Sequence, residues 1–233
     1  MVPTLLAVAH GTADPAGVAA VEELLSQVAA LRPDVPVRLG WLERAEPSAS
    51  AVLARLAGPV IVVPALLSTG YHVTVDIGRL VAGRPSTAVA SQLGPDRRLA
   101  EVVADRLRPV RRVGTDVVLF GAGSSDPAAF DQLRETARLL ASLLAAAEGV
   151  APTVHSRFLT DASWQDGLPD LVDVAGYLLA PGHFQDRLAQ RAAAVGAGVP
   201  APLGADPRVA EVLWDRYDAA LADLDSNRVA GSG

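Results

Sequence analysis

Two stretches of the chain, LGPDRRLAEVVADR at residues 93–106 and LGADPRVAEVLWDR at residues 203–216, align without a gap. Nine of the fourteen positions are identical, and the offset is 203 − 93 = 110 residues. HGTADP (10–15) corresponds in the same way to AGSSDP (122–127), and STGYHVTVD (68–76) corresponds to the shorter APGHFQD (180–186). Motifs that recur in the same order indicate a duplicated structural unit. The sequence therefore predicts two copies of one domain.

Each copy alternates continuous apolar runs with amphipathic segments, a pattern typical of a parallel sheet covered on both faces by helices. We expect strands at residues 4–10, 35–42, 59–67, 87–93, 115–123, 152–159 and 172–180. We expect helices at residues 15–31, 48–57, 97–107, 127–147, 183–195 and 207–222, with a short one after residue 76.

The predicted fold class is α/β, with two tandem similar domains that each contain a parallel sheet of about four strands. The N-terminal domain, residues 1–109, is expected to carry the active site, and residues 114–224 to form a repeat that has largely lost it. RPVRRVG (108–114) is interpreted as the linker between them, and residues 225–233 as a disordered tail.

Composition excludes several classes of protein. The 233 residues include no cysteine and no lysine, which excludes disulfides, iron–sulfur clusters, P-loop nucleotide binding and lysine Schiff bases. A G-x-G-x-x-G motif is absent, so a dinucleotide cofactor is not expected. The net charge of −6 argues against a nucleic-acid partner, and no apolar run approaches the length of a membrane span. We expect a cytoplasmic protein that binds no membrane and is a monomer or weak dimer.

Three polar residues follow successive strands of the first copy: His10, Glu43 and His72. In parallel sheets, ligands bind at the carboxyl ends of the strands. Two imidazoles and a carboxylate suit a divalent metal such as cobalt, iron, nickel or zinc. The second copy has Ala122, Thr160 and His183 at these positions, so we expect the metal site in the first copy only.

Other polar residues have competing interpretations. Ser124 and Ser125 near His183 could indicate a serine hydrolase, but the G-x-S-x-G motif is missing and Asp126 is better explained as the start of a helix. His155 lies within a predicted strand and is interpreted as structural. Glu46 is either a helix-start residue or a second carboxylate at the site.

The motifs AHGTADP, WLERAEPS, LLSTGYHVTVDI, GSSDP, LLAPGHFQDRL and PLGADP resemble those of the two-domain sirohydrochlorin chelatases of the CbiX/SirB type. The resemblance extends to about residue 222. It implies the class II chelatase fold and a lyase that inserts Co²⁺ or Fe²⁺ into sirohydrochlorin without ATP, toward cobalamin or sirohaem. It also implies that His10, Glu43 and His72 are the metal-binding and catalytic residues.

The chain departs from the family pattern at two positions. Ala13 stands where the family usually has arginine, and Asp206 where it usually has histidine. A non-catalytic metal- or tetrapyrrole-carrying protein on the same scaffold is therefore the alternative function. Because sirohydrochlorin is a polycarboxylate, arginines near strand ends are candidates for its binding. These arginines are Arg79, Arg157 and Arg187.

Overall fold

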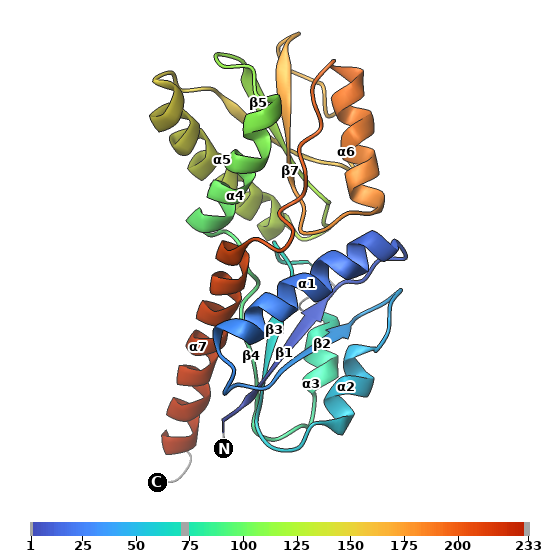
Figure 1. Cartoon of the computed structure of the whole chain (residues 1–233), viewed down its shortest axis with the longest axis vertical. Helices are drawn as coiled ribbons and strands as arrows, with labels where there is room; N and C mark the ends of the chain where they lie inside the picture. The colour runs from blue at the N-terminus through green and yellow to red at the C-terminus, as the bar shows by residue number, and fades with distance from the viewer. Residues whose placement is uncertain (1, 71–74, 231–233) are drawn as a thin grey trace. The chain divides into compact units, whose positions relative to one another are not determined.

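A computed structural model describes the backbone of residues 2–70 and 75–230, in which parallel strands alternate with helices (Figure 1). The first copy contains β1 (Thr4–Ala9), α1 (Pro15–Leu31), β2 (Val37–Trp41), α2 (Ala49–Arg55), β3 (Val60–Pro64), α3 (Ile77–Val81), β4 (Thr87–Val89) and α4 (Arg97–Leu107). After a short 3₁₀ helix, η2 (Arg108–Val110), come β5 (Asp116–Gly121), α5 (Pro127–Glu148), β6 (Val154–Phe158), β7 (Val172–Tyr177), α6 (His183–Ala194) and α7 (Pro207–Ala230).

Every strand and helix expected from the sequence is present, and only one end differs by more than a few residues. Helix α7 continues to Ala230, past residue 225, where the expected tail begins. No glycine or proline interrupts the chain between Pro207 and Gly231, so nothing in the sequence stops the helix earlier. Residues 231–233 lie outside the described part of the chain.

Two parallel sheets form the framework. The first has the strand order β2-β1-β3-β4 and the second the order β6-β5-β7. The second sheet has three strands, whereas about four were expected in each. The stretch that corresponds to β4 contains Pro200 and Pro202, which have no N–H to donate to a sheet. Leu203 instead makes one backbone hydrogen bond, to the carbonyl oxygen of Leu178.

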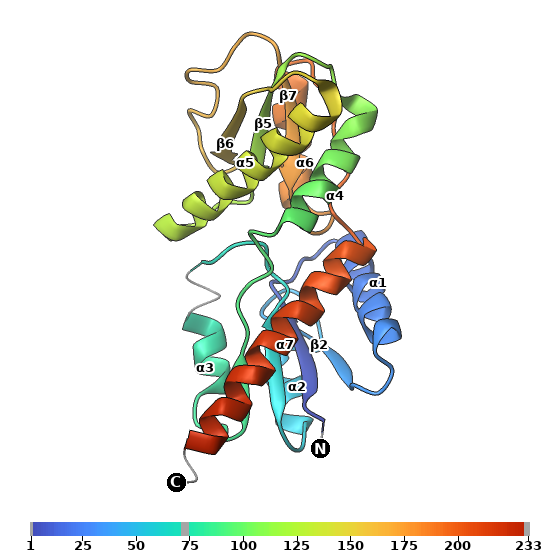
Figure 2. The same cartoon turned by 90° about the vertical axis from the view of Figure 1, so that its left-hand side faces the viewer.

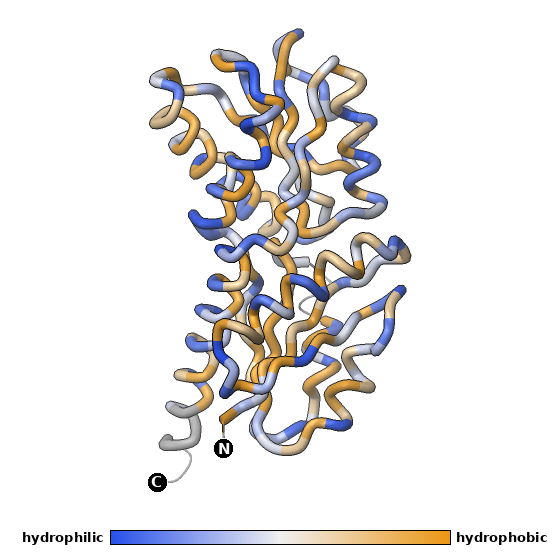
Figure 3. Tube along the Cα trace, in the orientation of Figure 1, coloured by the Kyte–Doolittle hydropathy of each residue, from blue (hydrophilic) through white to orange (hydrophobic). Residues whose placement is uncertain are grey.

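In the first sheet, side chains alternate between two covered faces. Leu6, Val8, Val60 and Val62 pack with α2 and α3 in one apolar cluster. The alternate residues of β1 and β3 are also fully buried, on the face where α1 and α7 lie. The strands accordingly appear as predominantly hydrophobic stretches of the trace in Figure 3.

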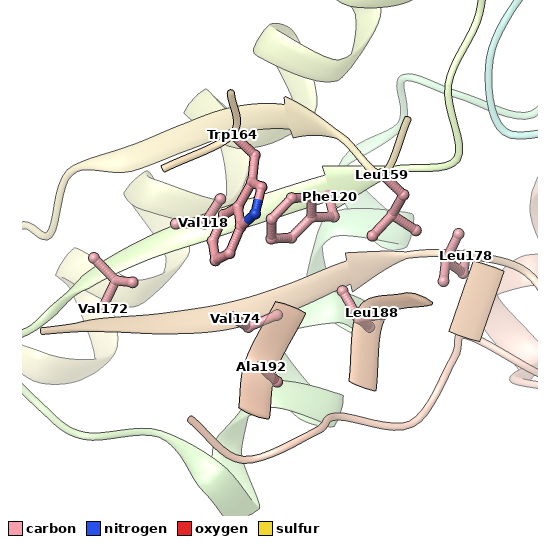
Figure 4. Packing of buried hydrophobic residues seen from close by; sticks show 9 residues of the cluster. All are labelled: Val118, Phe120, Leu159, Trp164, Val172, Val174, Leu178, Leu188 and Ala192. Atoms are coloured by element: carbon pink, nitrogen blue, oxygen red, sulfur yellow. The ribbon is translucent and has the colours of Figure 1, made fainter. Parts of the chain in front are cut away.

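The second sheet buries an aromatic cluster on one face. The rings of Phe120 and Trp164 meet edge to face with centroids 5.3 Å apart, and Leu188 and Ala192 of α6 pack against them (Figure 4). On α4 and α5, Leu99 and Leu140 are fully buried, and the two helices contact each other. None of the helices in the described part of the chain is both long and apolar enough to cross a membrane.

The chain forms two compact units that do not coincide with its two sequence copies. The first unit comprises Met1–Leu66, Tyr71–Leu93 and Ala205–Gly233, and the second Leu67–Gly70 and Gly94–Gly204. They differ from the expected domains, 1–109 and 114–224, because the copies exchange their last helices. Helix α4 packs against α5 and β7, whereas α7 packs against α1, β3 and β4 (Figure 2).

Each exchanged helix is held by one arginine. Arg216 of α7 donates to the carbonyl oxygens of Gln92 (3.0 Å) and Leu93 (2.7 Å). Arg106 of α4 makes the matching bonds, of 3.2 and 3.0 Å, to the carbonyl oxygens of residues 202 and 203. The offset is again 216 − 106 = 110 residues. The final arginine of the repeated motif therefore fastens each helix to the unit into which it is exchanged.

The segment interpreted as a linker is part of the second unit, where it is tied by buried ion pairs. Asp173, only 1% exposed, accepts hydrogen bonds from the guanidinium groups of Arg111 and Arg112 at 2.7 Å each and from the hydroxyl of Thr115 at 3.0 Å. Arg111 also pairs with Glu148 of α5 at 2.8 Å. Residues 111–115 are thus a fixed part of the second unit and not a free linker.

We expect Arg216→Met to lower the free energy of unfolding by about 2 kcal/mol, measured by urea denaturation. The change removes two hydrogen bonds from a charged donor and leaves two carbonyl groups without that partner. Arg134→Met is the control, because Arg134 is 67% exposed and pairs only with Asp131 at 3.5 Å. The control should change stability by less than about 0.5 kcal/mol. Equal losses in both variants would contradict the role of Arg216.

We expect Asp173→Asn to cost about 3–5 kcal/mol at neutral pH, because it leaves Arg112 without its buried counter-charge and Arg111 with Glu148 alone. Burial raises the pKa of Asp173, but the hydrogen bonds from Arg112, Arg111 and Thr115 outweigh it, so the pKa lies below its ordinary value. A depressed pKa stabilises the fold above the unfolded-state value of about 3.9 and loses that contribution as pH falls. The gap in unfolding free energy between wild type and variant should therefore shrink below about pH 3.9. A gap that stays constant down to pH 2 would contradict this.

Candidate functional site

His10 and Glu43 come together where β1 and β2 end. The parallel pairing continues past the strands, because Leu42 donates its N–H to the carbonyl oxygen of Ala9 at 2.9 Å and Glu43 donates to that of His10 at 3.0 Å. His10 Nε2 lies 3.7 Å from Glu43 Oε1, and the two side chains are 42% and 44% exposed. The structure thus brings two of the three predicted site residues together at a solvent-accessible position.

Gly11 makes this approach of the two backbones feasible. It has φ = 108°, and a Cβ on it would lie 1.7 Å from the carbonyl oxygen of Glu43. No other residue fits there without moving that carbonyl group. The His-Gly pair of the motif therefore acts together: His10 places an imidazole at the strand end, and Gly11 allows the chain that carries the Glu43 carboxylate to come close.

The chain turns sharply directly after Glu43. Arg44 has φ = 59°, and the Ala45 N–H donates to the Glu43 carbonyl oxygen at 2.8 Å, which closes a three-residue turn. Arg44 Nε donates to Glu43 Oε1 at 3.0 Å, so the oxygen that faces His10 also accepts from a guanidinium group. Arg44 could not be predicted as a site residue, because a positive φ at a single arginine has no sequence signature.

His72, the third predicted ligand, lies outside the described residues. The segment before it belongs to the second unit, where Gln132 Oε1 on α5 accepts the N–H of Thr69 at 2.8 Å. Within residues 2–70 and 75–230, no three His, Cys, Asp or Glu side chains group closely enough to hold a metal. The expected trio therefore remains a prediction, with its first two members adjacent.

The second copy keeps the backbone pairing at this position but has neither the histidine nor the carboxylate there. Leu159 donates its N–H to the carbonyl oxygen of Gly121 at 2.9 Å, as Leu42 does to Ala9. Gly123 has φ = 131°, and a Cβ on it would lie 2.6 Å from Thr160 Oγ1. His183 is exposed at the start of α6, with its ring 5.5 Å from that of Phe184.

The competing interpretations of polar residues are settled by their hydrogen bonds. Asp126 caps α5 by accepting the N–H of Ala128 at 2.9 Å, and Ser124 Oγ accepts the N–H of Asp126 at 3.0 Å, so these residues start a helix. His155 Nε2 lies 3.3 Å from Asp116 Oδ2, a structural pair as expected.

Glu46 and Asp206 also shape the backbone. Glu46 Oε2 accepts the N–H of Ser48 at 2.7 Å immediately before α2, which supports the helix-start interpretation of this carboxylate. Asp206 Oδ1 accepts the N–H of Arg208 at 3.1 Å at the start of α7, as Asp96 does for Arg98 at 3.0 Å at the start of α4. The residue in the usual histidine position of the late motif is therefore a helix cap.

The three arginines predicted to bind substrate differ in their surroundings. Arg79 on α3 is 73% exposed and lies 3.7 Å from Asp76. Arg187 lies half-buried on α6. Arg157 donates to the carbonyl oxygens of Trp164, Ser156 and Asp166, each at 2.9 Å. Its guanidinium group therefore holds the chain after β6.

We expect Gly11→Ala to lower the free energy of unfolding by about 3 kcal/mol, because both the strained φ and the overlap with the Glu43 carbonyl group must be relieved. Gly83→Ala is the control: Gly83 has φ = 74°, and a Cβ on it would meet nothing within 4 Å. Thermal or urea denaturation should show a loss of only about 1 kcal/mol for the control. If the two variants lose the same stability, the close approach at Gly11 does not matter.

Solved structures similar to this chain share its fold. SirB from Bacillus subtilis with Fe³⁺ is 24% identical, with a TM-score of 0.75 over 97% of this chain and 98% of that chain. The sirohydrochlorin chelatase SirB from Bacillus subtilis subspecies spizizenii in complex with cobalt is 21% identical, with a TM-score of 0.73 over 93% of this chain and 94% of that one. The expected α/β chelatase architecture is thus confirmed.

The relatives found by sequence match less than half of this chain. The sirohydrochlorin cobaltochelatase of Methanosarcina acetivorans is 29% identical over 121 residues, which is 45% of this chain and 93% of that protein. The sirohydrochlorin cobaltochelatase of Methanococcoides burtonii is 31% identical over 87 residues, 36% of this chain and 66% of that protein. The CbiX family model matches residues 4–110, which contain both His10 and Glu43. Through these residues, the chain is similar to the CbiX family.

Proposed function

We propose that this protein is a sirohydrochlorin chelatase, a lyase that inserts Co²⁺ or Fe²⁺ into sirohydrochlorin without ATP. The observation that carries the proposal is the pairing of His10 with Glu43 at the carboxyl ends of β1 and β2, inside the segment that matches the CbiX family. The names of its relatives, which are sirohydrochlorin cobaltochelatases, support the same activity.

The proposed mechanism assigns the metal and the protons to different groups. His10 and His72 hold the divalent metal through neutral imidazoles, which bind reversibly and can release the ion. Two pyrrole N–H protons must leave the tetrapyrrole as M²⁺ enters, so bases or solvent water must accept two protons for each metal ion inserted. Glu43, 3.7 Å from His10 and half-exposed, accepts a pyrrole proton or completes the metal site.

Substrate binding requires cations, because sirohydrochlorin is a polycarboxylate and the chain is acidic overall. Arg79 and Arg187 are proposed to contact its carboxylates. Arg157 is left out of this proposal, because its donors already engage three backbone carbonyl groups. The donor set of two imidazoles and one carboxylate also accommodates Ni²⁺, so the choice of metal is a question for experiment.

The activity is tested by following the absorption spectrum of sirohydrochlorin with purified protein and limiting Co²⁺, Fe²⁺ or Ni²⁺. A chelatase accelerates the spectral change over many turnovers per protein molecule. A carrier protein would bind metal or tetrapyrrole stoichiometrically, without turnover. A rate equal to that without protein would overturn the proposed function.

We expect His10→Ala and His72→Ala each to remove most of the insertion activity, and Glu43→Gln to lower it with the fold intact. The double histidine variant should be little worse than either single one, because residues that act as a unit are non-additive. His183→Ala is the control from the second copy and should keep activity within about tenfold, since Ala122 and Thr160 give it no metal-binding partner. The opposite ranking would place the site in the second copy.

A further inference from the structure

Arg44 combines an unusual backbone with a charge contact at the site. Its φ of 59° is held by the Ala45 N–H bond to the Glu43 carbonyl oxygen, in a tight turn that is rare for residues other than glycine. The same carbonyl group lies against Gly11. Strained residues persist where the surroundings fix them, and they concentrate at functional positions.

The side chain of Arg44 shares one oxygen atom with the expected metal position. Arg44 Nε lies 3.0 Å from Glu43 Oε1, and His10 Nε2 lies 3.7 Å from that same oxygen. A metal bound by His10 Nε2 and Glu43 Oε1 would compete with the guanidinium group for this oxygen. It would also lie within a few ångströms of a fixed positive charge.

We infer that Arg44 is a positioning residue that holds Glu43 Oε1 in the metal-free protein and is displaced from it when the metal binds. The inference rests on the proposed function and assigns a role to a residue outside the predicted trio. A guanidinium group that competes for the oxygen weakens metal binding by charge repulsion. It also returns to the carboxylate when the metal leaves, which favours transfer of the ion to the tetrapyrrole over retention by the protein.

The test is calorimetric titration of the metal-free full-length protein with Co²⁺, without tetrapyrrole. We expect Arg44→Gln to bind Co²⁺ about tenfold more tightly than wild type, and Arg44→Lys, which keeps the charge, to stay within about threefold. The advantage of Arg44→Gln should shrink as ionic strength rises, because salt screens the repulsion at this exposed site. In the insertion assay, the tighter binding should lower kcat with limited effect on the KM for sirohydrochlorin.

Arg55→Gln is the matched control, because Arg55 is an exposed arginine at the end of α2 and its loss changes the net charge equally. It should leave Co²⁺ affinity unchanged. Arg44→Gly also removes the guanidinium group and tolerates the positive φ, so it should tighten binding as Arg44→Gln does, and it replaces that variant if the latter is unstable.

The outcomes separate this inference from the proposed function. If wild type binds Co²⁺ through His10 and neither Arg44→Gln nor Arg44→Gly binds more tightly, the role of Arg44 is overturned while the chelatase proposal stands. Equal tightening in Arg55→Gln would also overturn it, as an effect of net charge alone. If wild type binds no Co²⁺, or His10→Ala binds as wild type does, the metal site itself fails and the role of Arg44 with it.

Discussion

Arg216 on α7 donates to the carbonyl oxygens of Gln92 and Leu93, and Arg106 on α4 makes the same pair of bonds to the residues 110 positions further on. These contacts fix where each copy's last helix packs, and with it the completion of both sheets. They also explain why the repeated motif is so well preserved between the two halves: its aspartate caps the helix and its last arginine fastens it. Both copies need this aspartate and this arginine to place their last helix, whichever copy carries the candidate site.

The site depends on the framework in a different way. Parallel strands bring their carboxyl ends to one edge of the sheet, so the residues that follow β1 and β2 lie close together as a result of the fold alone. Gly11 then allows the backbone after β2 to come close, and the turn at Arg44 directs the guanidinium group onto the carboxylate of Glu43. In the second copy, Gly123 also has a positive φ, but it lies against the side chain of Thr160 and not against a backbone carbonyl group. The two copies thus share the backbone pairing at this edge, and only the first carries the histidine and the carboxylate of the candidate site there.

Much of the fold could be predicted, because apolar runs and helix caps are local signals. Asp14, Asp96 and Asp126 cap α1, α4 and α5 within the motifs that marked those helices in the sequence. The exchange of α4 and α7 could not be predicted, because a repeat looks the same in sequence whichever sheet its last helix covers. The continuation of α7 to Ala230 is not predicted from the sequence, because the polar residues after position 224 have the composition of a tail.

The candidate site was predictable in its residue types more than in its contacts. Strand ends point to His10 and Glu43, but the shared oxygen between Arg44 and His10 depends on a backbone angle that no motif records. Arg157 was chosen for its charge and place near a strand end. Which acceptors a guanidinium group uses depends on the course of the following loop, and here three carbonyl groups of that region occupy it.

The exchange of helices has a consequence for biosynthesis on the ribosome. The first sheet is complete in sequence once Leu93 has been translated, but the helix that covers part of it begins only at Pro207. At about 5–20 residues per second, roughly 6–23 seconds pass before synthesis of that helix begins. During this time the apolar face of β1 and β3, with Leu5 and Ile61, lacks the part of its native cover that α7 provides. The nascent chain therefore carries an unfinished hydrophobic surface through the synthesis of its entire second unit, which makes this interval the period of greatest exposure to chaperones and to misassociation.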